Sequence, residues 1–274
     1  MNKLTELSQS RELVLNLTLR ELRGKYKRSV LGWTWSLLNP LSTMLIYSLV
    51  FGVILKVQIP PGDPSGLEIF PLFLLCGLLP WNFLANGMIG GMEALVGNAN
   101  LIKKVYFPRE VLVIANVNSW AFSLCIEMGV LALALLVVGN MVLPWLPLVI
   151  LTMAVEFVFV LGMATLLSVL NVYFRDTRHL IGILLSLWFY LTPIVYPITL
   201  VPSHTEILGI DVAARLIYSL NPMVGFTAIY RSLLYDLRFP PLGPVVYVVL
   251  VSFATLAFGA FVFSRLEGRL AEEL

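Results

Sequence analysis

The chain has 274 residues, of which 59% are apolar and 12% are charged. Soluble domains carry about 25% charged residues, so this composition excludes a water-soluble enzyme, and the high hydrophobicity excludes a disordered chain. The formal net charge is only +2, which argues against nucleic acid as a partner. Cys76 and Cys125 lie inside apolar runs and predict neither a disulfide framework nor a metal site.

Residues 4–28 form the first predicted element, an amphipathic helix that lies along the membrane surface. The apolar side chains expected on one face share helical spacing and are Leu15, Leu19, Leu22 and Tyr26. The basic side chains in the C-terminal part of this segment are Arg20, Arg23, Lys25, Lys27 and Arg28. Two interpretations stay open: a basic flank that sets topology and contacts anionic membrane lipids, or a surface with a function of its own.

Six segments are apolar enough to cross a membrane, for which a helix needs about 20 mainly apolar residues. Three of them, 30–55, 69–92 and 239–264, contain no charged residue. Residues 110–175 predict a hairpin of two further spans, because glycine, asparagine and proline turn signals lie between positions 139 and 147.

The sixth predicted span covers residues 180–201, and Pro193 and Pro197 predict a kinked or broken outer end. The expected fold class is therefore an all-α, polytopic membrane protein with six transmembrane helices, in a single domain over residues 1–274. With the N-terminus in the cytoplasm, fourteen of the 18 Lys and Arg residues lie on that side and four lie outside. The positive-inside rule then places both termini in the cytoplasm, and no cleaved signal peptide is expected.

Two short cytoplasmic segments join the predicted spans. Residues 98–108 predict a short helix, with Asn100 as its N-cap and Pro108 at its end. In the turn 175–179, Asp176 lies near the start of the next helix. These segments are either solvated connections or rigid elements against which a partner protein pushes.

Residues 202–238 lie outside by the charge rule but are half apolar. They predict two short helices, about 204–220 and 223–237, separated by Asn221-Pro222. A re-entrant or interfacial helical pair fits this pattern, because non-helical backbone at membrane depth needs support from protein or a water-filled cavity. A cap on the outer surface of the bundle stays open as the alternative.

Two carboxylates, Glu127 and Glu156, lie inside the predicted hairpin of spans. Each is about 22 Å along its helix from the turn, so the two are expected at matching depth. An ionisable group in the membrane points to a function. They are expected to form structural hydrogen bonds, to share a proton or to face a polar conduit, and a proton relay would indicate a secondary transporter.

Several aromatic residues are expected either to anchor the helices at the membrane interface or to line a glycan path, since aromatic faces stack on sugar rings. These candidates are Trp33, Tyr47, Trp188, Phe189, Tyr190 and Tyr196. Gly87, Gly90 and Gly91 permit close helix packing. The sequence has no P-loop, no Gly-x-Ser-x-Gly elbow and no His-Glu-x-x-His motif, which argues against an enzyme.

Six short motifs occur in order along nearly the whole chain. They are RGKYKRSVLGWTWSLLNP at 23–40, GLLPW at 77–81, NLIKKVYFP at 100–108, YFRDTR at 173–178, TPIVYP at 192–197 and LNPM at 220–223. Each motif is weak alone, but together they resemble the membrane subunit of ABC-2-type exporters of bacterial cell-surface polysaccharides.

This resemblance implies a homodimer with two copies of a separate nucleotide-binding ATPase subunit, which binds ATP and Mg, and no cofactor in this chain. The substrate would be a lipid-linked polysaccharide, such as an O-antigen or a teichoic acid, that crosses the bacterial cytoplasmic membrane. Segment 98–108 would be the main coupling helix, and segment 202–238 would resemble the extracytoplasmic gate. The first and fifth spans would border the channel.

The resemblance also implies roles for individual residues. The ATPase-coupling candidates are Asn100, Leu101, Lys103, Lys104, Tyr106, Phe107, Pro108, Arg175, Asp176 and Arg178. Arg20, Arg23, Lys25, Lys27 and Arg28 would hold the phosphate linker of the substrate. The rival classes are an ABC-2 exporter of drugs or lipids, a proton-coupled secondary transporter and an intramembrane enzyme.

Overall fold

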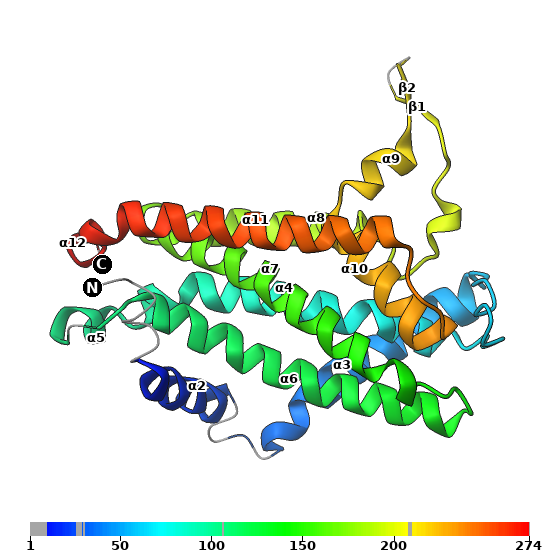
Figure 1. Ribbon diagram of the computed structural model, residues 1–274, viewed down its shortest axis with the longest axis horizontal. Coiled ribbons are helices and arrows are strands. Elements are labelled where there is room, and N and C mark those ends of the chain that lie inside the picture. Colours follow the sequence, from blue (N-terminus) through cyan, green and yellow to red (C-terminus); the bar gives the residue numbers. More distant parts are fainter. Residues whose placement is uncertain (1–9, 26–28, 30, 106, 208–209, 274) are drawn as a thin grey trace.

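Long helices formed by the apolar runs pack side by side into an elongated bundle (Figure 1). The structure is a computed structural model and describes residues 10–25, 29, 31–105, 107–207 and 210–273. Five helices among these residues are long and apolar enough to cross a membrane. They are Leu37–Ile54, Phe70–Gly97, Glu110–Val137, Leu143–Tyr173 and Leu242–Leu266. The predicted all-α, polytopic class is confirmed.

The central helix of the bundle is α4 (Phe70–Gly97), and 78% of its most apolar stretch is buried. α6 (Glu110–Val137) and α7 (Leu146–Tyr173) pack along α4, and α11 (Leu242–Leu266) packs along α7. α6 and α7 form the expected helical hairpin. Because α4 contacts neighbours on most sides, it organises the packing of the whole chain.

The first span lies at the side of this bundle. It consists of α3 (Trp35–Tyr47) and a π-helical segment, Ser48–Ile54. Only 6% of the stretch Leu37–Ile54 is buried, and apolar side chains such as Leu45 and Val53 are exposed. Within one copy of the chain, this helix leaves most of its apolar surface to lipid or to another protein.

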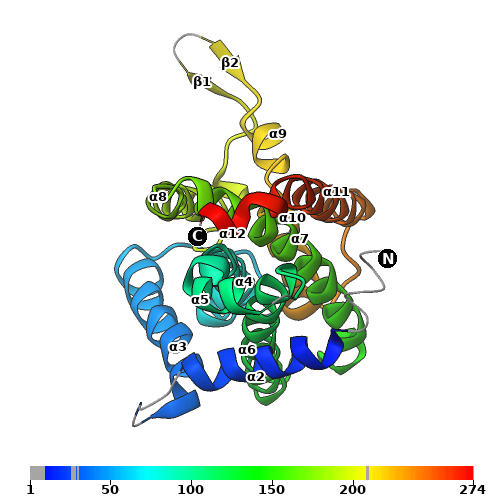
Figure 2. The ribbon, with the colours of Figure 1, turned by 90° about the vertical axis from the view of Figure 1, so that its left-hand side faces the viewer.

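The surface helix α2 (Arg11–Lys25) lies across the bundle and packs against α6 (Figure 2). Of the predicted apolar face, Leu22 is buried together with Leu17, whereas Leu15 and Leu19 are exposed, and the position along the membrane surface stays a prediction. The helix meets α6 along one line only. Apolar side chains that lie off this line therefore face outward.

The sixth predicted span is shorter than expected. Its helix, α8 (Thr177–Tyr190), has 14 residues, fewer than the roughly 20 needed to cross a membrane. The chain leaves the helix before Pro193 and continues through turns. The break near the prolines is confirmed, while the total of six spans stays a prediction.

The segment 202–238 contains a small antiparallel hairpin in place of the first expected helix. Its strands are β1 (Thr205–Ile207) and β2 (Ile210–Val212), with Thr205 opposite Val212. Only α9 (Ala214–Ser219) remains of the helix expected over 204–220. β-branched residues at 205, 207, 210 and 212 favour the extended conformation, which explains this correction.

The second helix of that segment forms as predicted. It consists of α10 (Pro222–Tyr230), with the Asn221 side chain accepting a hydrogen bond from the Met223 amide, and a π-helical turn, Arg231–Asp236. Its side chains are buried against α4, α7 and α11. α10 therefore packs among the helices of the bundle, while a re-entrant position in the membrane stays a prediction.

The remaining short elements complete the chain. They are Gly32–Thr34, α5 (Ala99–Lys104), Leu143–Trp145, Ile198–Leu200, Glu267–Arg269 and α12 (Leu270–Glu273). α5 and α12 lie at one end of the bundle, which we call the α5 end (left in Figure 1). The opposite end, where α4 begins and α6 ends, is the far end.

Glycines allow the closest helix contacts in the bundle. A Cβ atom on Gly87 would lie 2.6 Å from Val160, and one on Gly91 would lie 2.6 Å from Ala164, so α4 approaches α7 closely, as predicted. Gly162 was not singled out from the sequence. A Cβ atom there would lie 2.5 Å from the backbone nitrogen of Leu256 in α11.

Candidate functional site

The α5 end presents a short, firmly held helix between α4 and α6. Asn98 occupies the cap position of α5, so the predicted cap at Asn100 was wrong. This shift follows from where α4 ends, because α5 begins two residues after Gly97. Ile102 is buried and Leu101 packs against the core, whereas Lys103 and Lys104 are exposed.

A shallow basic hollow of about 210 Å³ lies beside α5. Its lining residues are Ile102, Lys103, Lys104, Val105, Phe107 and Arg109. The Arg109 guanidinium donates to the backbone carbonyl of Glu267, which ties this hollow to the C-terminal segment. Phe107 and Pro108 are half-buried beside it, and Tyr106 lies outside the described residues. The hollow therefore combines cationic groups with an apolar floor.

The second turn predicted to contact a partner, 175–179, lies beside the α4–α5 junction. The Arg178 Nε atom is 2.7 Å from Glu93 Oε1, which joins the start of α8 to the last turns of α4. Arg175 and Asp176 are exposed. The structure thus brings both predicted coupling segments to the same end of the bundle.

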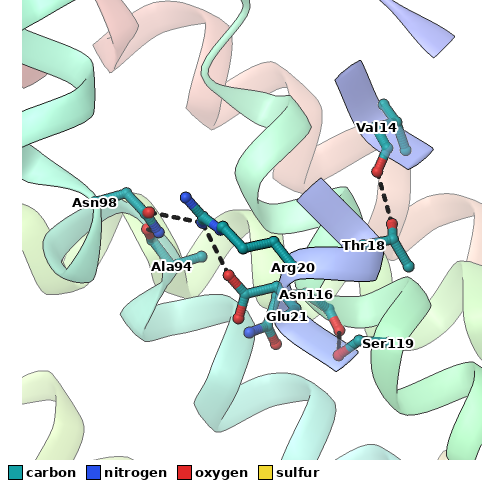
Figure 3. A network of polar contacts seen from close by, with 8 residues as sticks. All are labelled: Val14, Thr18, Arg20, Glu21, Ala94, Asn98, Asn116 and Ser119. Carbon is teal, nitrogen blue, oxygen red and sulfur yellow. Dashed lines mark hydrogen bonds and ion pairs between the residues drawn. The ribbon is translucent and has the colours of Figure 1, made fainter. Parts of the chain in front are cut away.

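Arg20 connects α2 to the junction between α4 and α5 (Figure 3). Its guanidinium donates to Glu21 Oε1 at 2.9 Å and to Asn98 Oδ1 at 2.7 Å. The Asn98 side-chain amide in turn donates to the carbonyl of Ala94 at 2.8 Å. A candidate phosphate-binding residue therefore contacts the first residue of the coupling segment.

Lys25 is directed into the bundle and does not offer its charge to a substrate. Its Nζ atom donates to the Ser119 carbonyl at 3.0 Å and lies 3.3 Å from the ring centroid of Trp120. Burial lowers the pKa of Lys25 to about 7, and the nearby carboxylates of Glu127 and Glu21 oppose this shift. The phosphate role assigned to Lys25 is therefore replaced by a role in docking α2 on α6.

The other basic candidates of this region differ in placement. Arg23 is exposed, and the Arg20 side chain is 46% exposed. Both lie where an anionic group can reach them. Lys27 and Arg28 lie outside the described residues.

The two carboxylates face different neighbours. Glu156 is fully buried, and its Oε2 atom accepts a hydrogen bond from the Tyr230 hydroxyl of α10 at 2.7 Å. Glu127 lines an otherwise apolar cavity of about 440 Å³ between α3, α4 and α6. For Glu156 the predicted structural hydrogen bond is confirmed.

Five of the six candidate aromatic residues gather where α3, α4 and α8 meet. The Phe189 ring stacks on the Tyr47 ring, with 5.8 Å between the ring centroids, and its centroid lies 5.2 Å from that of Tyr190. The ring centroids of Trp188 and Trp81 of α4 are 5.9 Å apart. The Tyr196 hydroxyl donates a hydrogen bond to the Tyr190 carbonyl. The side chain of Trp33, the sixth candidate, lies outside the part of the structure that is described.

A buried arginine holds the break after α8 and was missed in the sequence. The Arg231 guanidinium donates to the carbonyls of Pro193 at 2.6 Å and Ile194 at 2.7 Å, and it lies 3.6 Å from the Phe73 ring centroid. Arg231 is only 8% exposed. The available signal was a single arginine within an apolar stretch, Met223–Tyr235.

Comparisons with known proteins identify the family. The profile of the ABC-2 type transporter family matches residues 12–235. The chain therefore belongs to the ABC-2 type transporter family and is a membrane permease.

Three individual relatives within this family are similar to the chain. The chain is 33% identical over 280 residues to the O-antigen export system permease protein RfbA of Myxococcus xanthus, covering 98% of each chain. It is 29% identical to RfbA of Klebsiella pneumoniae, covering 96% of this chain and 95% of the relative. It is 28% identical to the polysialic acid transport protein KpsM of Escherichia coli, covering 69% of this chain and 71% of the relative.

Proposed function

We propose that this chain is the permease subunit of an ATP-driven ABC exporter that moves a lipid-linked cell-surface polysaccharide, such as an O-antigen, across the bacterial cytoplasmic membrane. The observation that carries the proposal is the end-to-end similarity to O-antigen export permeases. Five membrane-spanning candidates support it. So does the short helix α5 at one end of the bundle, which we call the elbow.

A separate ATPase subunit would supply the energy at the α5 end, which we place in the cytoplasm. ATP and Mg would bind to that subunit, since this sequence has no P-loop. α5 and the turn at 175–179 would transmit its movement. The basic hollow at Lys103, Lys104 and Arg109 fits a partner surface that carries carboxylates.

A second copy of the chain would complete the channel. The hairpin β1–β2 and α9 project sideways from the bundle (Figures 1 and 2). Ile194, near the start of this arm, lies close to the middle of α4, since its Cα atom would be 3.6 Å from a Cβ atom on Gly77. Non-helical backbone at membrane depth must be covered by protein or line a water-filled cavity. A homodimer in which copies meet along α3 and α8 would provide this cover.

The substrate would enter at α2 and leave beside the aromatic cluster. Exposed Arg20 and Arg23 would hold the phosphate linker, because guanidinium groups match phosphate in charge and geometry. The exposed ring of Tyr190 would face the glycan. ATP binding would close the ATPase subunits, move the elbows and open the path between the two permease copies.

Charge reversal on the elbow tests the coupling. We expect Lys103→Glu combined with Lys104→Glu to prevent assembly with the ATPase, because like charges would then meet at the interface. Co-purification and the ATPase rate of the complex measure this effect. Lys56→Glu, at an exposed lysine outside the elbow, is the matched control and should behave as wild type. Normal assembly of the double variant would remove α5 from the interface.

Depletion of the chain identifies the cargo. We expect a lipid-linked glycan to accumulate on the cytoplasmic leaflet, which lipid extraction and mass spectrometry can detect. An unchanged glycan pool, together with new sensitivity to small toxic compounds, would instead identify a drug exporter.

A further inference from the structure

We propose that Arg20 and Asn98 report the presence of substrate to the coupling helix α5. This inference rests on the proposed function, because it takes the phosphate linker of a lipid-linked glycan as the ligand of Arg20. In the structure, the Arg20–Asn98 hydrogen bond joins residues 78 positions apart. It connects the helix where substrate would enter to the segment that would contact the ATPase.

One nitrogen of Arg20 serves both of its partners. The same Nη2 atom donates to Glu21 at 2.9 Å and to Asn98 at 2.7 Å. Asn98 offers a neutral amide oxygen, whereas a phosphate offers charged oxygens that form stronger hydrogen bonds with guanidinium. A diphosphate at the surface of α2 would therefore draw Arg20 away from Asn98.

When Arg20 leaves Asn98, the hydrogen bonds at the start of α5 change. The Asn98 side chain also donates to Ala94 in the last turns of α4, and its carbonyl accepts from the amides of Leu101 and Ile102 in α5. Asn98 thus carries bonds on both sides of the α4–α5 junction. Releasing its oxygen alters the restraint on α5 without requiring movement of α4.

α2 itself stays in place during this exchange. Lys25 holds its C-terminal end on α6 through the Ser119 carbonyl and the Trp120 ring, and Leu17 and Leu22 remain buried. The exchange is therefore confined to the Arg20 side chain. Asn98 therefore positions α5 through its bond with Arg20. The bound substrate does not need to contact Asn98 itself.

The test uses the complex of the chain with its ATPase in lipid nanodiscs, titrated with undecaprenyl diphosphate. We expect undecaprenyl diphosphate to stimulate the wild-type ATPase rate. Asn98→Ala should abolish most of this stimulation, by about 5-fold or more as for typical coupling between sites. The dissociation constant for undecaprenyl diphosphate should not rise, because alanine removes a competitor for Arg20 and no group that binds the ligand.

Two further variants sharpen the test. Asn86→Ala is the matched control, since Asn86 lies in α4 and, like Asn98, donates to the carbonyl four residues earlier, but the described contacts do not link it to α2. It should respond as wild type. Asn98→Asp should keep the stimulation but shift it to higher undecaprenyl diphosphate concentrations, because a carboxylate holds Arg20 more strongly than the amide does.

The outcomes separate the inference from the function on which it rests. Full stimulation in Asn98→Ala, or equal losses in Asn98→Ala and Asn86→Ala, would overturn the inference and leave the exporter proposal intact. Stimulation by phosphatidylglycerol nanodiscs or inorganic pyrophosphate alone would overturn the link to the lipid carrier. A wild-type complex that neither responds to undecaprenyl diphosphate nor exports glycan would refute the proposed function itself.

Discussion

Some polar contacts between segments are exposed, such as the Arg178–Glu93 ion pair at the α5 end, whereas the contacts that hold α10 and the π-helical turn after it are buried. The Arg178–Glu93 ion pair has side chains that are 64% and 38% exposed. In contrast, Glu156 and Tyr230 are fully buried, and Arg231 is 8% exposed. Both groups join helices that are distant in sequence, so their difference lies in access to solvent.

This difference indicates separate tasks for the two sets of contacts. Exposed ion pairs contribute little to stability, typically below about 1 kcal/mol, so they can be exchanged for contacts with a partner or substrate at small cost. Breaking a buried polar contact leaves an unsatisfied group and costs more. The buried contacts are therefore suited to hold α10 in place, and the exposed contacts at the α5 end are suited to change partners.

The largest effect is expected for Arg231→Ala. It leaves the carbonyls of Pro193 and Ile194 without their donor, at a cost of roughly 1–3 kcal/mol for each buried acceptor. Thermal unfolding of the purified protein in detergent measures the loss. Arg238→Ala is the control, because Arg238 is 50% exposed and pairs with Asp63 and Asp236. Equal destabilisation by both changes would remove the distinction between buried and exposed contacts.

A smaller effect is expected at the contact between α7 and α11. Gly162→Ala places a Cβ atom against the backbone of Leu256 and should cost roughly 1–3 kcal/mol by overpacking. Gly129→Ala is the matched control, because a Cβ atom there meets nothing within 4 Å, and alanine favours a helix over glycine. Unfolding in detergent should show opposite signs for the two changes. A stable Gly162→Ala variant would contradict the close packing of these helices.

The smallest effect is expected for Glu127→Gln combined with Glu156→Gln. Glutamine keeps an oxygen that can accept the Tyr230 hydroxyl, and hydrogen bonds between membrane helices average about 0.6 kcal/mol. ATP-driven export, measured in proteoliposomes, should persist. Loss of transport with unchanged stability would instead indicate a proton-coupled carrier.

The spans and the helical hairpin were predictable because they depend on local composition. Apolar length and the turn signals near 139–147 define them without tertiary information. The helix at Pro222 was also predictable, since Asn221-Pro222 is a strong start signal. The six short motifs, in their order along the chain, indicated the ABC-2 family by resemblance.

The remaining features depend on contacts between distant segments. Helical periodicity places Lys25 about 200° around α2 from Arg23, but only the docking of α2 on α6 determines that the Lys25 face is the one turned inward. The role of Arg231 needs the break after Tyr190, which frees the carbonyls that it binds. Asn98, and not Asn100, begins α5 because α4 continues to Gly97. Each of these outcomes is set by where another helix ends or packs.

ATP-driven transport in proteoliposomes tests the central claim most directly. We predict that a lipid-linked glycan moves across the membrane only when this chain, its ATPase partner and Mg-ATP are all present. Transport by this chain alone, driven by an imposed pH gradient, would contradict the claim.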